Sequence, residues 1–251
     1  MRDLRIPGDP VAVAVGTDGL APFPEDWNRA LGIVAHPDDM EYGAASAVAR
    51  WTDHGKDVRY VLVTRGEAGI STMPPAKVGP LREQEERRGG LVVGVSVVEF
   101  LDHADGLVEP DLKLRRDLSE AIRRHQPEVI LSINHRDSWG GPSWNHADHR
   151  AVGRALLDAV RDAANPWIFP DAGPAWGGVR FAAFNASPVS THAVDVTGYV
   201  ERGIESLLCH ELYLANLEGD DDPGEVLRTS AQSVGQRLGV SQAVAFELVM
   251  L

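Results

Sequence analysis

A short segment near residue 36 carries side chains with a clear capacity for chemistry. Within six residues, His36 is followed by three carboxylates, Asp38, Asp39 and Glu41. Three carboxylates packed so closely repel one another unless a cation lies among them. Taken alone, the same residues also suit a turn at the end of a strand, with an Asp capping the next helix.

A second segment, residues 145–149, contains two histidines three residues apart. If a helix begins here, His146 and His149 lie on one face of its first turn, and Asp148 is placed to orient one imidazole. Such a pair alone is also common on helix surfaces. The two segments together, each after an expected parallel strand, favour a metal site.

We expect His36, Asp39 and His149 to hold a catalytic metal. Two imidazoles and one carboxylate leave a fourth position open to water, as in catalytic zinc sites. The chain has one cysteine, which excludes sites with two or four thiolates, and the expected ligands suit zinc or ferrous iron. Asp38 is then the expected general base on the water, and His146 the acid or oxyanion partner.

The elements that must position these residues alternate between strands and helices. Short apolar runs predict strands at residues 31–35, 58–64, 95–101, 129–134, 181–185 and 192–196. Helices are expected at residues 44–54, 81–93, 111–125, 148–164 and 200–217. This alternation predicts one α/β domain, with a mainly parallel sheet, helices on both faces, and the chemistry in loops at the carboxyl ends of strands.

Composition and charge narrow the classes of function. The chain has 251 residues and a net charge of −13, which argues against nucleic-acid binding and anionic membrane surfaces. It has no long apolar span and no leader-like start, so a cytoplasmic protein is expected. We expect an N-terminal arm at 1–28, a metal-dependent enzyme domain at 29–220, and a C-terminal appendage at 221–251 packed on that domain. The apolar residues 243–251 suit an interface or, more consistently, a last core strand.

Residues 29–165 resemble the LmbE-like, PIG-L-type de-N-acetylases. The resembling motifs, in the same order and spacing, are residues 35–41, 64–69, 82–85, 100–106 and 146–150. This family includes N-acetylglucosaminyl-phosphatidylinositol deacetylase and the deacetylases and amidases of mycothiol and bacillithiol metabolism. The resemblance implies a three-layer Rossmann-like fold and metal-dependent hydrolysis of an amide. It also implies the ligand and base roles given above and a small N-acetyl amino-sugar substrate, with homo-oligomers frequent among members.

The resemblance adds two residues and marks two departures. Arg82 matches an arginine that family members turn toward sugar hydroxyls. His210 matches a further site histidine of the family, although this chain lacks the Ser-Gln that often follows that histidine in other members. Asn145 stands where members usually have glycine. Trp144 stands where some have a tyrosine that assists the tetrahedral intermediate, so that phenolic donor is not expected.

Substrate contacts are suggested by aromatic and acidic residues near the expected site. Trp139 and Trp144 suit stacking on a sugar face or packing within an ordered loop, and Glu67 suits a sugar hydroxyl or a structural turn. Two alternatives stay open. One is an amidase that cleaves a larger acyl or cysteinyl amide of a thiol-sugar conjugate. The other is a non-catalytic sugar- or nucleotide-binding domain, although no phosphate-binding loop follows a strand.

Overall fold

The computed structural model describes residues 19–217 and 222–251. Its central sheet has the strand order β1-β9-β10-β8-β5-β2-β3-β4. The strands are β1 (Ala21–Pro22), β2 (Arg29–Val34), β3 (Asp57–Leu62), β4 (Val98–Phe100), β5 (Val129–Ile133), β8 (Phe181–Asn185), β9 (His192–Asp195) and β10 (Ala243–Met250). β10 runs antiparallel to both its neighbours, and the other pairs are parallel, so the expected mainly parallel sheet is confirmed.

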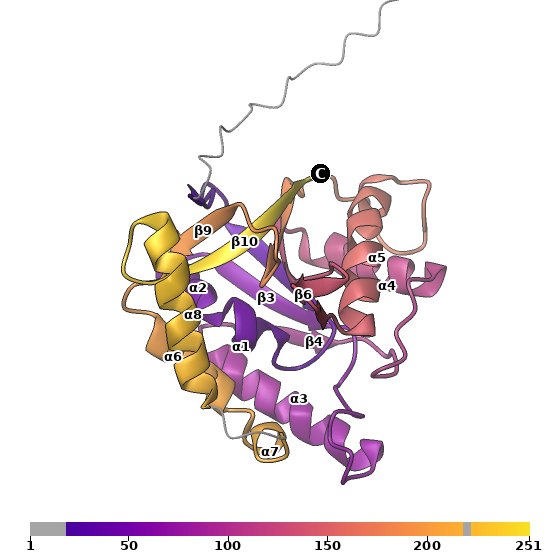
Figure 1. Cartoon of the computed structure of the whole chain (residues 1–251). Helices are drawn as coiled ribbons and strands as arrows, with labels where there is room; N and C mark the ends of the chain where they lie inside the picture. Colours follow the sequence, from indigo (N-terminus) through magenta and orange to yellow (C-terminus); the bar gives the residue numbers. More distant parts are fainter. Residues whose placement is uncertain (1–18, 218–221) are drawn as a thin grey trace, which may run out of the picture.

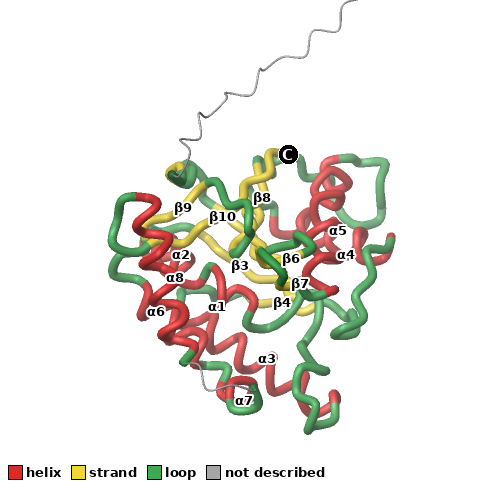
Figure 2. Tube along the Cα trace, in the orientation of Figure 1, coloured by secondary structure: helices red, strands yellow, loops and turns green. Residues whose placement is uncertain are grey.

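Helices cover both faces of this sheet (Figures 1 and 2). On one side lie α4 (Leu112–His125) and α5 (Ala147–Ala164). The opposite side carries α1 (Asp39–Gly43), α2 (Ala45–Asp53), α3 (Pro75–Val92), α6 (Val200–Leu208), α7 (Glu211–Leu214) and α8 (Pro223–Leu238). A separate hairpin of β6 (Ser138–Gly140) and β7 (Ser143–Trp144) precedes α5.

The apolar strand sequences are explained by burial on both faces. In β2, Ala30 and Val34 belong to the core beneath α2, whereas Leu31 and Ile33 belong to the core beneath α4 and α5. Side chains alternate between the two faces of a strand, so a strand covered on both sides must be apolar at nearly every position.

Two expected helices have different limits in the structure. The helix expected at 81–93 begins at Pro75, because a proline in the first turn lacks only an N–H that has no helical partner there. The helix expected at 200–217 is divided into α6 and α7. The break allows His210, between them, to be fully buried. The short helix α1 and the β6–β7 hairpin were not predicted.

The chain ends contribute to the sheet in ways that the expected division does not describe. Residues 1–18 and the expected boundary at 220–221 lie outside the described residues. Within the described part of the arm, Ala21 and Pro22 pair with β9. The C-terminal segment supplies β10, an interior strand between β8 and β9, in agreement with the last core strand expected at 243–251. Across residues 19–217 and 222–251, no helix is long and apolar enough to span a membrane.

The sheet topology brings the two chemistry-bearing segments together. β2 lies between β3 and β5, and the chain proceeds from β2 toward β3 and β4 on one side and from β5 toward β8 on the other. The strand order therefore reverses at the β2–β5 boundary, where open α/β sheets bind their ligands beyond the carboxyl ends of the strands. The loops after β2 and β5 both emerge there, and they carry His36 and the residues leading to α5.

Candidate metal centre and active site

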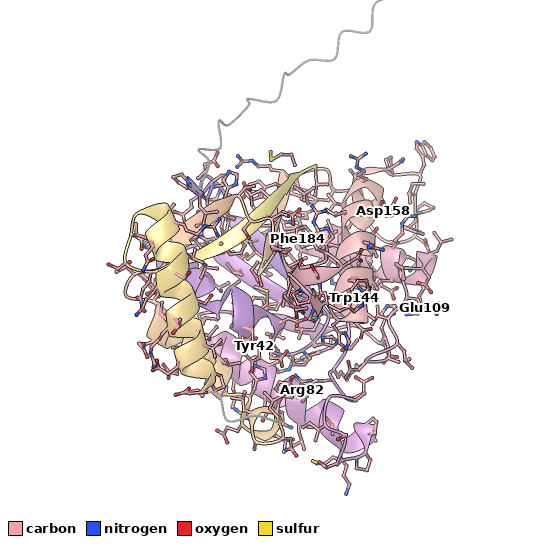
Figure 3. The ribbon with its side chains drawn as sticks, in the orientation of Figure 1. Tyr42, Arg82, Glu109, Trp144, Asp158 and Phe184 are labelled. Atoms are coloured by element: carbon pink, nitrogen blue, oxygen red, sulfur yellow. The ribbon has the colours of Figure 1, made fainter. Side chains whose placement is uncertain are left out.

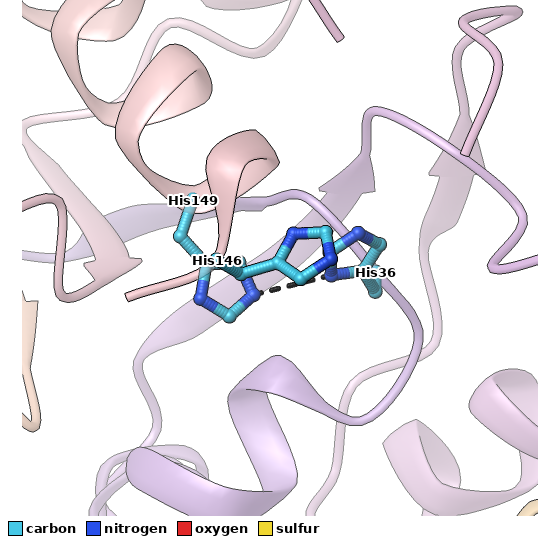
Figure 4. A group of neighbouring side chains, drawn as sticks. All are labelled: His36, His146 and His149. Carbon is cyan, nitrogen blue, oxygen red and sulfur yellow. Dashed lines mark hydrogen bonds between the residues drawn. The ribbon is translucent and has the colours of Figure 1, made fainter. Parts of the chain in front are cut away.

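Three histidines from two distant loops face one another at this edge of the sheet (Figure 4). His36 follows β2, His146 is the N-cap of α5, and His149 lies in the first turn of that helix. One ring nitrogen from each lies within 4.8 Å of the others. The expected juxtaposition of the two histidine segments is therefore present.

The partners of His36 fix which of its nitrogens faces the centre. His36 Nε2 lies 3.1 Å from Asp105 Oδ1 and 3.2 Å from Asp148 Oδ2. A carboxylate accepts hydrogen bonds, so Nε2 carries a hydrogen and Nδ1 points toward His149 Nε2, 3.1 Å away. Burial lowers the pKa of His36, but Asp105, Asp148 and Asp39 outweigh it and hold the pKa well above its ordinary value. The carboxylates around this ring thus create an environment that favours a positive charge, which a bound cation also supplies.

His149 is oriented in the same manner by an amide. Its Nδ1 donates to Asn145 Oδ1 at 3.1 Å. The amide orientation of Asn145 is defined because Nδ2 donates to the carbonyl oxygens of Asn134 (2.7 Å) and Arg136 (2.9 Å). His149 Nε2 is then left with a lone pair directed at His36, the state in which an imidazole ligates a metal.

Asp39 completes a set of three electron-pair donors. Its Oδ1 lies 3.0 Å from His149 Nε2, and its Oδ2 lies 3.7 Å from His36 Nδ1. Burial raises the pKa of Asp39, but His149 and His36 outweigh burial and hold the pKa well below its ordinary value. Two imidazole nitrogens and a carboxylate directed at one another, each with its outer contacts satisfied, fit a divalent cation with an open position.

His146 offers a further nitrogen, but its contacts suggest a different role. Its Nδ1 accepts the backbone N–H of Asp148 at 3.2 Å, so the neutral ring carries its hydrogen on Nε2. Burial, together with His36 and His149, lowers the pKa of His146 and favours that neutral form. His146 is therefore arranged as a hydrogen-bond donor beside the centre.

The imidazole that the Asp148 carboxylate contacts is that of His36 rather than that of His146. The same carboxylate accepts the backbone N–H groups of Gly106 (2.7 Å) and Val108 (3.2 Å). Asp148 is fully buried. It therefore joins the loop after β4 to the His36 ring, and only its backbone reaches His146.

Asp38, the expected general base, lines the cavity beside these donors. Its backbone has a φ of 99°, a left-handed conformation that costs roughly 1–3 kcal/mol for a residue with a Cβ. Its carboxylate accepts from Arg82 Nη2 at 3.0 Å. Burial raises the pKa of Asp38 to about 6, although Arg82 lowers it. A carboxyl group with this pKa changes protonation near neutral pH, as a general base must.

Arg82 and Glu67 contact the chain itself rather than standing free for a sugar. Arg82 is almost fully buried and donates to the carbonyls of Pro37 and Gly66 as well as to Asp38. A Cβ at Gly66 would lie 2.2 Å from its Nη1, so glycine there admits the guanidinium. Glu67 accepts the N–H groups of Arg65 and of the Asp105 loop. Its geometry favours the structural turn over the sugar contact.

A cavity of about 410 Å³ adjoins the metal donors. Its lining residues are His36, Asp38, Asp39, Tyr42, Gly69, Arg82, Asp105, Ile133, Trp139, His146, His149 and Tyr213. Tyr42, Asp105 and Tyr213 were not among the expected site residues. Asp105 could have been found, because it follows the third strand within a family-like motif. Nothing in the sequence placed Tyr42 or Tyr213 in the cavity. The ring of Tyr213 lies 4.0 Å from the Arg82 guanidinium, and Figure 3 labels Tyr42 and Arg82 in this part of the molecule.

The two tryptophans of the β6–β7 hairpin have different positions. Trp139 lines the cavity, with its ring edge-on to His149 at a centroid distance of 5.6 Å. Trp144 is 67% exposed, lies against the Arg150 guanidinium and is absent from the cavity lining. Only Trp139 therefore remains a candidate for contact with substrate.

A second group of donor side chains lies buried behind the cavity. It consists of Glu41, Glu86 and His210, and His210 Nε2 is 3.7 Å from an oxygen of each glutamate. His210, expected as a substrate contact, is fully buried and is absent from the cavity lining. Its surroundings indicate an internal role.

Fold and site together define an α/β enzyme with a candidate metal centre beside the buried carboxylate of Asp38. Residues 31–160 match the PIG-L family, described as GlcNAc-PI de-N-acetylase. The chain belongs to this family, as the sequence motifs predicted.

Known relatives are consistent with this membership. Diacetylchitobiose deacetylase of Thermococcus kodakarensis is 28% identical over 195 residues, which cover 76% of this chain and 71% of the relative. The structure of N,N′-diacetylchitobiose deacetylase from Pyrococcus horikoshii superposes with a TM-score of 0.79 at 24% identity, covering 90% of this chain and 85% of that one. The predicted fold is thereby confirmed, as is the assignment to a family of N-deacetylases.

One relative catalyses a different reaction. The 4-oxalmesaconate hydratase of Pseudomonas putida is 32% identical over 117 residues, which cover 44% of this chain and 45% of the hydratase. The fold therefore serves more than one reaction, and the chemistry of the present site must be argued from its own residues.

Proposed function

We propose that the chain is a zinc-dependent hydrolase that removes the acetyl group from an N-acetylglucosamine-type sugar. The observation that carries this proposal is the arrangement of His36, His149 and Asp39, whose inner donor atoms converge beside the cavity-lining carboxylate of Asp38. The metal would be held by those three side chains. When bound, it supplies Lewis acidity toward the amide carbonyl and lowers the pKa of water.

The other residues provide the proton transfers of amide hydrolysis. Asp38 takes a proton from the attacking water as the C–O bond forms. The Nε2–H of His146 donates to the oxygen of the amide carbonyl as negative charge develops on it. The C–N bond breaks when the nitrogen has gained the proton, which Asp38 can return, and the products are acetate and the free amine.

The sugar class is supported by the relatives and by the cavity. Two of the relatives act, by name, on diacetylchitobiose and on a 2-acetamido-2-deoxy-glucopyranoside conjugate of inositol. The cavity volume of about 410 Å³ lies in the range of small-molecule sites. Trp139 presents an aromatic ring at the metal side of the cavity, where it can pack on the C–H face of a pyranose.

The test combines metal content with product release. Purified protein is freed of metal with a chelator and titrated with zinc or ferrous iron. Free amine and acetate released from N-acetylglucosamine and N,N′-diacetylchitobiose are then measured. We expect one metal per chain and activity that follows occupancy, with zinc sufficient for turnover. The control is Asp38→Asn, which keeps the side-chain size.

Two outcomes would contradict the proposal. Release of a longer acyl or cysteinyl group, with N-acetyl sugars untouched, would identify the amidase alternative. Hydration of an unsaturated carboxylate, without any release of amine, would show that the chain is a hydratase like the Pseudomonas putida relative.

A further inference from the structure

The backbone of Asp38 adopts a conformation that its own residue type disfavours. Its φ of 99° lies in the left-handed region, and the residue that precedes it is Pro37. Neighbouring groups must hold a residue with a Cβ in such a conformation. The conformation matters because it sets the direction in which the Asp38 carboxylate leaves the chain toward the cavity.

Two side chains of α3, four residues apart on one face of the helix, hold Asp38 from the same side. Arg82 donates to the carbonyl oxygen of Pro37 and to the Asp38 carboxylate. Glu86 Oε2 accepts the backbone N–H of Asp38 at 3.2 Å. Arg82 thus restrains the Asp38 carboxylate and the carbonyl of the Pro37–Asp38 peptide group, whereas Glu86 restrains the N–H of that same peptide group.

Glu86 is itself immobilised by complete burial. Its Oε2 faces His210 Nε2 at 3.7 Å, and Glu41 lies at the same distance from that nitrogen. Within the described residues, Glu86 Oε1 has no hydrogen-bond partner. The hydrogen bond that the Glu86 carboxyl group makes there is the one from the Asp38 N–H to Oε2. A buried carboxyl group is costly to keep, and an apolar side chain would fill the same space without that cost. Its hydrogen bond to Asp38 accounts for its presence.

We propose that Glu86 is a positioning residue for the general base, and that its hydrogen bond to the Asp38 N–H holds Asp38 in the left-handed conformation that aims its carboxylate at the reacting water. This inference rests on the proposed function, in which Asp38 is the base. It assigns Glu86 a role through geometry rather than charge.

Two substitutions separate the hydrogen bond from the charge. Glu86→Gln is neutral but retains an acceptor for the Asp38 N–H. Glu86→Met is neutral, has similar length, and removes the acceptor. We expect Glu86→Met to lower kcat by about 10- to 100-fold, the loss that follows from misplacing a catalytic group by about an ångström. KM and metal content stay near the wild-type values, and Glu86→Gln retains kcat within about threefold.

Glu85→Met provides the matched control. Glu85 is also buried, lies next to Glu86 on α3, and accepts the N–H of Leu212 at 2.6 Å. Its loss removes a buried acceptor of the same kind without touching Asp38. We expect the thermal midpoint to fall in both methionine variants, but kcat to fall strongly in Glu86→Met alone.

A second readout does not depend on activity. Hydrogen exchange of the Asp38 amide, followed by NMR on ¹⁵N-labelled protein, should be slow in the wild type and in Glu86→Gln and fast in Glu86→Met. Equal exchange in the two variants would overturn the inference, even if the wild type had no deacetylase activity. With an active wild type, equal kcat in the two variants, or a change confined to KM, would overturn it as well.

Discussion

Asn145 Oδ1 accepts a hydrogen bond from His149 Nδ1 at 3.1 Å, and the same amide donates to two backbone carbonyls of the loop after β5. Asn145 occupies the position at which the family usually has glycine. This departure from the family pattern therefore supplies an orienting contact for a candidate metal ligand.

This contact predicts a specific effect on metal affinity. Asn145→Ala removes the acceptor for His149 Nδ1–H, so the ring loses its fixed orientation. We expect metal affinity to fall by about 10- to 100-fold, as for other partners of ligating histidines. Competition with a fluorescent chelator measures the change. Asn145→Asp keeps an acceptor at this position and should bind metal more tightly than the alanine variant; the reverse order would refute the role.

Replacement of Asp38 should lower the catalytic rate, whereas replacement of His149 should remove the metal. Asp38→Asn keeps an acceptor for Arg82 but cannot take a proton from water, so we expect kcat to fall by about 10²- to 10⁴-fold with metal content unchanged. His149→Ala should instead lose the metal. Elemental analysis and amine release on the same preparations distinguish the two effects. Full activity in Asp38→Asn would remove it as the base, and unchanged metal content in His149→Ala would remove that ligand.

The two tryptophans of the hairpin should differ in their effect on substrate use. Trp139 lines the cavity against His149, whereas Trp144 is 67% exposed beside Arg150. We expect Trp139→Ala to lower kcat/KM by about tenfold, the equivalent of 1.4 kcal/mol, and Trp144→Ala to change it less than threefold. Steady-state kinetics on one N-acetyl sugar compares them. A larger loss in Trp144→Ala would contradict the assigned positions.

Glu247 of β10 predicts a pH-dependent contribution to stability. Burial raises the pKa of Glu247, but hydrogen bonds from Arg136 and Ser187 outweigh burial and keep the pKa below its ordinary value. The ionised form is therefore favoured by folding. Its stabilising effect is complete above the pKa of the unfolded chain and is lost as the pH falls through the folded pKa.

Urea denaturation of metal-free protein tests this contribution. We expect Glu247→Gln to lower the free energy of unfolding by about 1–2 kcal/mol at pH 7, because Arg136 is half exposed and screened. The difference from the wild type should shrink toward pH 4. A difference that stays constant with pH would show that the charge of Glu247 is not involved.

The sequence predicted the parts of this molecule that depend on local pattern. The apolar runs at β2, β3 and β5 predicted parallel strands, and the site loops were found because polar residues follow those strands directly. The juxtaposition of His36 with His149 followed from topology, since both loops leave the carboxyl edge of neighbouring strands.

Other features depend on contacts that no local pattern encodes. The local sequence around Arg82 is compatible with a side chain that faces a sugar and with one that faces Asp38. The packing of α3 against the loop after β2 decides between these two orientations. Tyr213 reaches the cavity because the chain breaks at His210, and that break follows from burial against Glu41 and Glu86. The metal ligands and substrate contacts themselves remain predictions that the experiments above address.

The position of β10 has a consequence for how the protein is made. β10 follows all the other strands in the chain, yet it joins β8 to β9, and β1 reaches the sheet through β9. A nascent chain still lacking residues 243–250 therefore has β8 as an edge strand, with β9 and β1 unattached. Such a chain also lacks Glu247, which holds Arg136 at the base of the hairpin. Closure of the sheet between β8 and β9 and the contact of Glu247 with Arg136 beside the hairpin are therefore both established only once β10 has been synthesised.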